Sequence, residues 1–156
     1  MIVAILIFVS YLIVTGIKFG ITPSISASHY KWREKGVAYE ALFTLFCWGV
    51  TFSILPIWLD NTSSNIQFIP FLAAAGLGFV GASPLFKDNK LENRVHSISA
   101  MICAVGSYLW SFMGGNMWLA IIAILITIPV YFKMKNKVYW AEIIAFIHLF
   151  IQLILI

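Results

Sequence analysis

Charged side chains are scarce in this sequence. Of its 156 residues, 10% are Asp, Glu, Lys or Arg, whereas 62% are hydrophobic. Because a water-soluble domain carries roughly 25% charged residues, this chain has too few to cover an ordinary water-facing surface. We therefore predict an integral membrane protein whose outer surface is solvated by the lipid bilayer.

Cysteine is also rare, and no basic residue precedes the first apolar run. Two cysteines in so apolar a chain are more typical of packing residues than of a disulfide framework. A cleavable signal peptide begins with a positively charged segment, but here the first basic residue, Lys18, follows the run from Ile2 to Gly16. This order predicts an uncleaved first membrane helix.

Long apolar runs are what the sequence has in abundance. Helices of roughly 16 to 22 residues match a hydrocarbon core about 30 Å thick. Six such runs occur, at residues 2–19, 38–59, 67–86, 95–113, 117–132 and 139–156. We predict an all-α integral membrane protein, a single transmembrane domain over residues 1–156, with six helices in three hairpins joined by short loops.

The ten basic residues lie in or beside alternate connections. They are Lys18, Lys31, Arg33 and Lys35 at the first, Lys87, Lys90 and Arg94 at the third, and Lys133, Lys135 and Lys137 at the fifth. The positive-inside rule therefore places the odd-numbered loops in the cytoplasm and both termini outside. This placement accounts for the net charge of +4 without a nucleic-acid partner. It predicts a multi-pass protein of the bacterial cytoplasmic (inner) membrane.

The first connection, Ile21–Val37, is the one sizeable segment between predicted spans. Its basic and aromatic residues suit a topology-fixing loop or a short helix lying on the inner leaflet. Ser24, Ser26 and Ser28 alternate before His29, a pattern that also suits a segment folded inward to cap the bundle or bind a ligand. The sequence leaves both interpretations open.

The third predicted span is rich in small residues. Residues 76–81 match the pattern G-x-G-x-x-G, but a dinucleotide site needs a strand before the glycines, and here they lie inside an apolar helix. Ala74, Gly78 and Ala82 instead form a small-xxx-small ladder, which is typical of close helix packing. The ladder predicts a face through which a homodimer would form.

Small and polar residues recur on the second, fourth and sixth spans at intervals of three and four. The stripes are Glu40, Thr44, Cys47 and Thr51; His96, Ala100, Cys103, Ser107 and Ser111; and Ala141, Ala145, His148 and Gln152. Such stripes face other helices rather than lipid. We infer that these three helices converge on a polar pocket open to the cytoplasm, with Glu142 about 100° away from the sixth stripe.

Ionisable and amide groups inside a membrane are costly and usually functional. The candidate binding residues are therefore Glu40, His96, Glu142, His148 and Gln152. The working hypothesis is a small membrane protein that binds or transports a small solute, an ion or a lipid.

Two other functions are compatible with the same residues. Cys47, Cys103 and His148 lie at similar depth, and two thiolates with one imidazole suit a zinc ion that activates water in a lipid-directed hydrolase. Zinc is the one cofactor that the sequence suggests, although no H-x-x-x-H pair is present. Alternatively, the stripes only hold helices together, and the chain is a non-catalytic accessory subunit of a membrane complex.

Overall fold

The fold is that of a computed structural model, which describes residues 1–155. Those residues form helices and connecting loops, with no strand among them. In chain order the helices are α1 (Ile2–Phe19), α2 (Ser28–Arg33), α3 (Val37–Glu40), α4 (Leu42–Asp60), the 3-10 helix η1 (Ser64–Ile66), α5 (Phe68–Ala82), α6 (Lys90–Met113), α7 (Met117–Lys133) and α8 (Lys137–Leu155). The predicted all-helical class is confirmed. Residue 156, the last of the sixth predicted span, lies outside the described residues.

Four helical stretches are long and apolar enough to cross a membrane. They are α1, the nearly continuous pair α3–α4, α6 and α8. The helices α5 and α7 are apolar but shorter, with 15 and 17 residues. Large apolar side chains such as Ile17, Phe52 and Phe132 are exposed on the outside of the bundle. These features fit a membrane protein, because lipid solvates an apolar exterior that water does not.

Two helix boundaries differ from the prediction for local chemical reasons. The helix α5 ends at Ala82, before Ser83 and Pro84, since the residue before a proline is disfavoured in helical conformation. The helix α6 begins at Lys90, earlier than predicted, because the Asn89 side chain accepts hydrogen bonds from the backbone N–H groups of the first turn.

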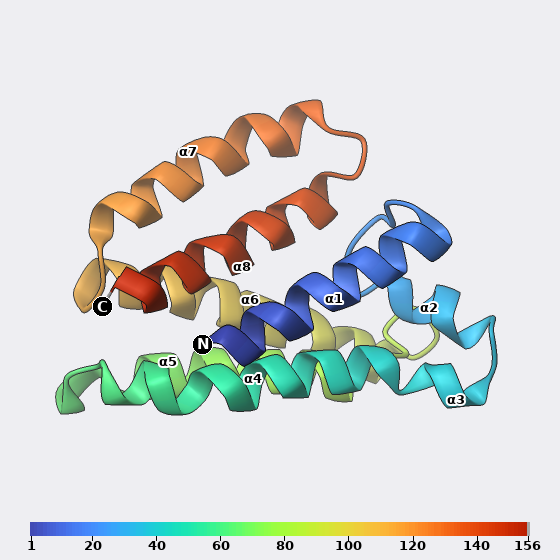
Figure 1. The fold of residues 1–156 in the computed structure, drawn as a ribbon, viewed down its shortest axis with the longest axis horizontal. Coiled ribbons are helices and arrows are strands. Elements are labelled where there is room, and N and C mark those ends of the chain that lie inside the picture. The colour runs from blue at the N-terminus through green and yellow to red at the C-terminus, as the bar shows by residue number, and fades with distance from the viewer. Residues whose placement is uncertain (156) are drawn as a thin grey trace.

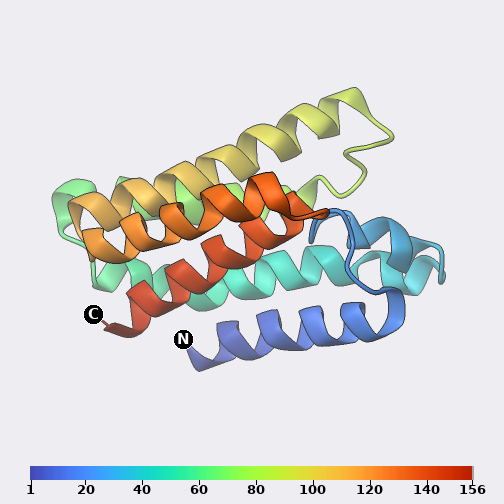
Figure 2. The same ribbon diagram turned by 90° about the horizontal axis from the view of Figure 1, so that it is seen from above.

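The helices pack in layers. In Figure 1, α4, α5 and α6 lie together along one side, with α5 packed against both of its neighbours. The helix α8 crosses this layer, and α7 packs on the outer side of α8. The helix α1 packs against α4, and Figure 2 shows it alongside α4 and α8.

Two glycines of α5 allow its close approach to the neighbouring helices. A Cβ at Gly76 would lie 2.7 Å from the backbone oxygen of Ser99 in α6, and one at Gly81 would lie 2.6 Å from Cys47 Cβ in α4. By contrast, a Cβ at Gly78 would meet nothing within 4 Å. The tight packing therefore uses residues of the G-x-G-x-x-G pattern, inside one chain.

The predicted small-residue ladder is not one continuous outer face. Ala74 is fully buried within the chain, Gly78 is half-buried and Ala82 is exposed. Ala74 is thus occupied by packing inside the protomer, and the face expected for a homodimer is reduced to Gly78 and Ala82. The homodimer itself stays a prediction.

The three basic connections meet at one end of the bundle, here called the basic-loop end. The Arg33 guanidinium lies 2.8 Å from the Asp88 carboxylate, which joins the first connection to the third. The Asn136 amide donates to the Ile21 carbonyl at 3.2 Å, which joins the fifth connection to the first. Both termini lie toward the other end, here called the terminal end (Figure 1). The predicted alternation of basic and non-basic connections therefore matches their positions in space.

Candidate functional site

A cavity of about 110 Å³ lies between α4, α5, α6, α8 and the first connection. Most of its wall is apolar. The lining residues are Ile25, Ser26, Phe43, Phe46, Cys47, Ile54, Trp58, Ala73, Ala74, Leu77, Val80, Ala100, Cys103, Ala104, Ser107, Glu142, Ala145, Phe146 and Leu149. The even-numbered spans do converge on a shared interior. The pocket they enclose, expected to be polar, is instead apolar with a few polar groups.

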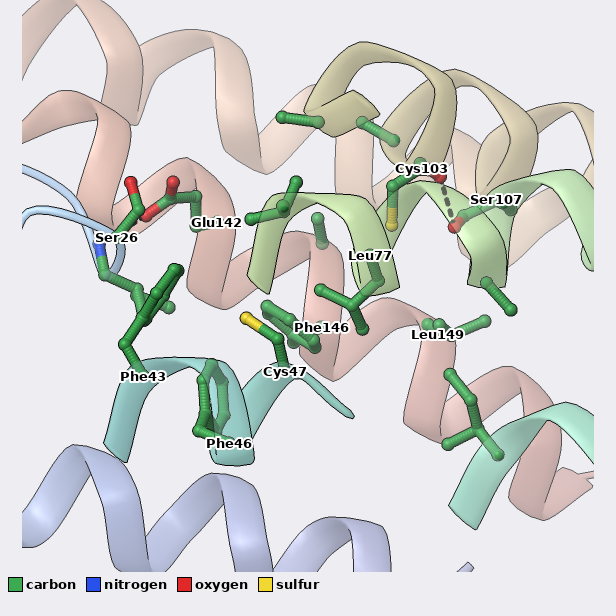
Figure 3. Close-up of a pocket in the computed structure, with 18 of the residues that line it drawn as sticks. Ser26, Phe43, Phe46, Cys47, Leu77, Cys103, Ser107, Glu142, Phe146 and Leu149 are labelled. Atoms are coloured by element: carbon green, nitrogen blue, oxygen red, sulfur yellow. Dashed lines mark hydrogen bonds between the residues drawn. The ribbon is translucent and has the colours of Figure 1, made fainter. Parts of the chain in front are cut away.

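The polar groups of the cavity are unevenly distributed. Glu142 and Ser26 lie together at one end, whereas Ser107 and Leu149 lie at the other (Figure 3). Cys47 and Cys103 point into the space between from different helices (Figure 3). The Ser107 hydroxyl donates to the Cys103 carbonyl at 2.7 Å, so it is already satisfied within α6. Glu142 is therefore the one charged residue of the wall.

The end of the cavity at Glu142 is closed by residues 21–36, here called the capping segment. The Ile25 backbone N–H donates to Glu142 Oε2 at 2.5 Å. The Tyr139 N–H donates to the Pro23 carbonyl at 3.2 Å, which ties the segment to the start of α8. The alternative in which this segment folds inward is confirmed. Ser26, one of the alternating serines of that prediction, lines the cavity, although it was not among the five candidate binding residues.

Local hydroxyl hydrogen bonds explain why the capping segment turns inward. Thr22 Oγ1 donates to the Ser24 carbonyl at 2.7 Å, Ser24 Oγ accepts from the Ala27 N–H at 3.0 Å, and Ser28 Oγ donates to the Ile25 carbonyl at 2.6 Å. Serine and threonine side chains that bond nearby backbone groups compete with regular helix and favour turns. The Tyr11 and Ser28 hydroxyls, 2.6 Å apart, then hold the turn against α1.

His29 lies beside the cavity wall but has no polar partner. Its side chain is 0% exposed, and neither ring nitrogen makes a hydrogen bond with a described residue. Its ring packs edge-on against Phe43, which lines the cavity, at a centroid distance of 6.3 Å. Burial lowers the pKa of His29 below its ordinary value, and the nearby charge of Glu40 opposes the effect. The imidazole is therefore held in its neutral form.

Four of the five predicted binding residues lie outside the cavity, and only Glu142 lines it. Glu40 lies 3.6 Å from the Arg33 guanidinium at the basic-loop end. His96 is buried, with Nδ1 3.0 Å from the Ser83 carbonyl and its ring stacked on Phe86 at 4.2 Å. Both residues are thus engaged in contacts within the fold.

His148 and Gln152 belong to a separate polar cluster at the terminal end. The Gln152 side chain accepts from the Asn116 N–H at 2.8 Å and donates to the Asn116 carbonyl at 2.7 Å. His148 Nε2 lies 3.2 Å from Ser111 Oγ, and its ring stacks on Tyr108 at 4.7 Å. This cluster joins α8 to α6 and to the turn before α7.

The three residues considered for zinc are not brought together. Cys47 and Cys103 line the cavity, but His148 does not. Within residues 1–155, no group of three His, Cys, Asp or Glu side chains is placed to hold a metal ion. The physical reason is the rotation of α8, whose cavity face consists of Glu142, Ala145, Phe146 and Leu149. The last three lie three, four and seven residues after Glu142, which places all four on one face of the helix. The sequence instead predicted that the polar stripe forms the inner face.

No protein-family model, curated protein or solved structure matches this chain. The function is therefore argued from the site itself. Chemically, an apolar cavity with one carboxylate at its end suits recognition of a molecule that is apolar along most of its surface and polar at one point.

Proposed function

We propose that the chain spans the membrane six times, as three hairpins, with the basic-loop end in the cytoplasm and both termini outside. The meeting of the three basic connections at one end supports this orientation. At about 1.5 Å per residue, the 15 residues of α5 cover less than a hydrocarbon core about 30 Å thick. Local thinning of the bilayer offsets the difference at a modest cost. A bacterial cytoplasmic membrane is the location that this topology implies.

The orientation is tested by labelling cysteines from outside intact cells. In a variant that lacks both native cysteines, Asn61→Cys places a thiol at the terminal end and Lys87→Cys places one at the basic-loop end. We expect a membrane-impermeant maleimide to label the Asn61→Cys protein in intact cells and the Lys87→Cys protein only after lysis. The reverse pattern would overturn the orientation.

We propose that the protein binds a small, mainly apolar molecule in this cavity, within the membrane. The observation that carries the proposal is a wall of apolar side chains interrupted at one end by Glu142. An apolar cavity of about 150 Å³ binds benzene, so a cavity of about 110 Å³ is of the size that a small hydrocarbon group occupies. At about 24 cal/mol per Å³, an empty cavity of 110 Å³ costs about 2.6 kcal/mol, which a ligand would recover.

Binding is favoured over passage across the membrane by the way the cavity ends at Glu142. At the basic-loop end, the capping segment is held by its bonds to Glu142 and Tyr139. Passage across the membrane would require these bonds to break, whereas binding between the helices does not.

The two native cysteines provide the test, because both line the cavity. The purified protein in detergent is treated with methyl methanethiosulfonate, a small neutral thiol reagent, and modification is followed by intact mass. We expect methylcyclopentane, a hydrocarbon of six carbons like benzene, to slow modification of both thiols several-fold. The control is an Ala82→Cys protein without the native cysteines, because residue 82 is exposed on the outside of α5. Unchanged rates at the native thiols would overturn the proposed cavity ligand.

A further inference from the structure

The Glu142 carboxylate has unused hydrogen-bonding capacity at the edge of the cavity. Within the described residues, its one hydrogen-bond partner is the Ile25 N–H, which bonds Oε2. A carboxylate accepts up to about four hydrogen bonds. The remaining oxygen, Oε1, is therefore available to a group that enters the cavity.

Within residues 1–155, no cationic side chain forms an ion pair with this carboxylate. The three ion pairs among residues 1–155 join Lys31 to Glu34 and Arg33 to Glu40 and Asp88, all at the basic-loop surface. The cavity wall contains no Lys, Arg or His. A charge in an apolar surrounding is stable when it is paired and hydrogen-bonded, so the charged form of Glu142 requires a cation that enters the cavity with the ligand.

Ser26 completes a small polar end to the cavity. Its hydroxyl lies next to Glu142 at the cavity wall (Figure 3) and 3.0 Å from Ser24 Oγ. A primary ammonium group has three N–H donors, which suits a carboxylate oxygen and a neighbouring hydroxyl as acceptors. The rest of the wall is apolar and offers contacts to a hydrocarbon body.

We propose that the ligand carries a primary ammonium group on a small apolar body, with Glu142 as its counter-ion and Ser26 as a second acceptor. This inference rests on the proposed cavity ligand and adds the chemistry of its polar end. The same ammonium group is present in a free alkylamine and in the headgroup of phosphatidylethanolamine.

The test measures protection of Cys47 and Cys103 from methyl methanethiosulfonate by four ligands that share one ring. These are cyclopentylamine, cyclopentanol, cyclopentanone and methylcyclopentane, at neutral pH in detergent. We expect cyclopentylamine to protect at a concentration about tenfold lower than cyclopentanol does. In Glu142→Gln, the protection by cyclopentylamine should weaken about tenfold, whereas that by methylcyclopentane stays within twofold. Tenfold corresponds to about 1.4 kcal/mol, the lower range for a hydrogen bond to a charged group.

Asp60→Asn is the matched control, because Asp60 is an exposed carboxylate at the end of α4, outside both the cavity wall and the capping segment. It should leave all four protection curves unchanged. The comparison of cyclopentylamine with cyclopentanol uses the unaltered protein, so it decides the question even where Glu142→Gln fails to fold.

The outcomes separate the two proposals. Protection by none of the four compounds overturns the cavity ligand itself. Equal protection by methylcyclopentane and cyclopentylamine in both proteins overturns the ammonium group and leaves the cavity ligand standing. Stronger protection by cyclopentanone than by cyclopentylamine also overturns it, because a neutral Glu142 would then donate to a carbonyl.

Vesicles distinguish the two sources of ammonium. If the thiols are protected in phosphatidylethanolamine vesicles but not in phosphatidylcholine vesicles, a lipid headgroup supplies the group. Equal reactivity in the two lipids, with protection by added cyclopentylamine, assigns a free amine. If neither lipid nor amine protects, the ammonium proposal is overturned.

Discussion

Replacement of Gly76 by alanine tests how closely α5 and α6 pack beside the cavity. The new Cβ would lie 2.7 Å from the Ser99 backbone oxygen and 3.0 Å from the Cys103 backbone nitrogen. Because both neighbours are backbone atoms, no side chain can rotate away. Ordinary contact begins at 3.4 Å, so the two helices must separate locally by about 0.7 Å. A gap of that size forfeits roughly a quarter to a half of the dispersion energy of each affected contact.

Gly78→Ala is the matched control, because a Cβ there meets nothing within 4 Å. Both substitutions gain the same helical preference of alanine over glycine, about 1 kcal/mol. The difference between them therefore isolates the cost of overpacking, about 1–3 kcal/mol. We expect Gly76→Ala to unfold at lower SDS fraction than Gly78→Ala, as followed by circular dichroism. Equal stability of the two variants would refute the close packing of α5 on α6.

Three further predictions concern the two ends of the bundle. Gln152→Leu removes both hydrogen bonds to Asn116. We expect this substitution to lower the free energy of unfolding by about 1–3 kcal/mol in the same SDS assay. An unchanged free energy would mean that this pair does not hold the terminal end. Arg33→Ala breaks the ion pairs with Glu40 and Asp88, whose side chains are 34% and 51% exposed. We expect the free energy of unfolding to fall by less than about 1 kcal/mol. A larger decrease would show that the basic-loop end depends on these ion pairs. Burial lowers the pKa of His29, so the unfolded chain binds a proton more readily than the folded protein does. The free energy of unfolding should therefore fall as the pH decreases below about 6.5. His29→Leu should reduce that slope in unfolding midpoints measured between about pH 7.5 and about pH 5, and an unchanged slope would contradict a neutral, buried imidazole.

The helices themselves were readable from the sequence because lipid solvation requires long apolar runs. The first predicted span coincides with α1, Ile2–Phe19, and the fifth differs from α7 by one residue. The grouping of the basic connections was readable for a similar reason, since charges leave the membrane where the helices end. These features depend on local composition, so they can be predicted from a single sequence.

The composition of the cavity wall could not be predicted from the sequence in the same way. The polar stripe on α8 assigned His148 and Gln152 to a shared pocket, yet His148 Nε2 contacts Ser111 of α6 and Gln152 bonds Asn116. Glu142 was placed off the stripe, and it is the residue that reaches the cavity. A stripe of polar residues marks the side of a helix that meets other helices, but the rotation and tilt of the helix decide which partner each residue meets.

The capping segment illustrates a second limit. Its serines and threonine favour turns, but the turn direction depends on contacts with Glu142 and Tyr139, which are more than a hundred residues away in the chain. Those contacts exist only once α8 has packed. The sequence therefore left a topology-fixing loop, a surface helix and an inward fold as alternatives, and only the assembled bundle decides between them.

Glu142 links the stability of the capping segment to the content of the cavity. Its Oε2 accepts the Ile25 N–H and thereby closes the basic-loop end, while its side chain also forms the polar end of the cavity wall. A ligand cation in the cavity would interact with the same carboxylate that accepts the hydrogen bond from the capping segment. The two interactions are compatible where each uses its own oxygen, because a carboxylate accepts at both. The arrangement thus allows the cavity to be occupied while the capping segment stays bonded to Glu142, which suits retention of a bound molecule better than its rapid passage.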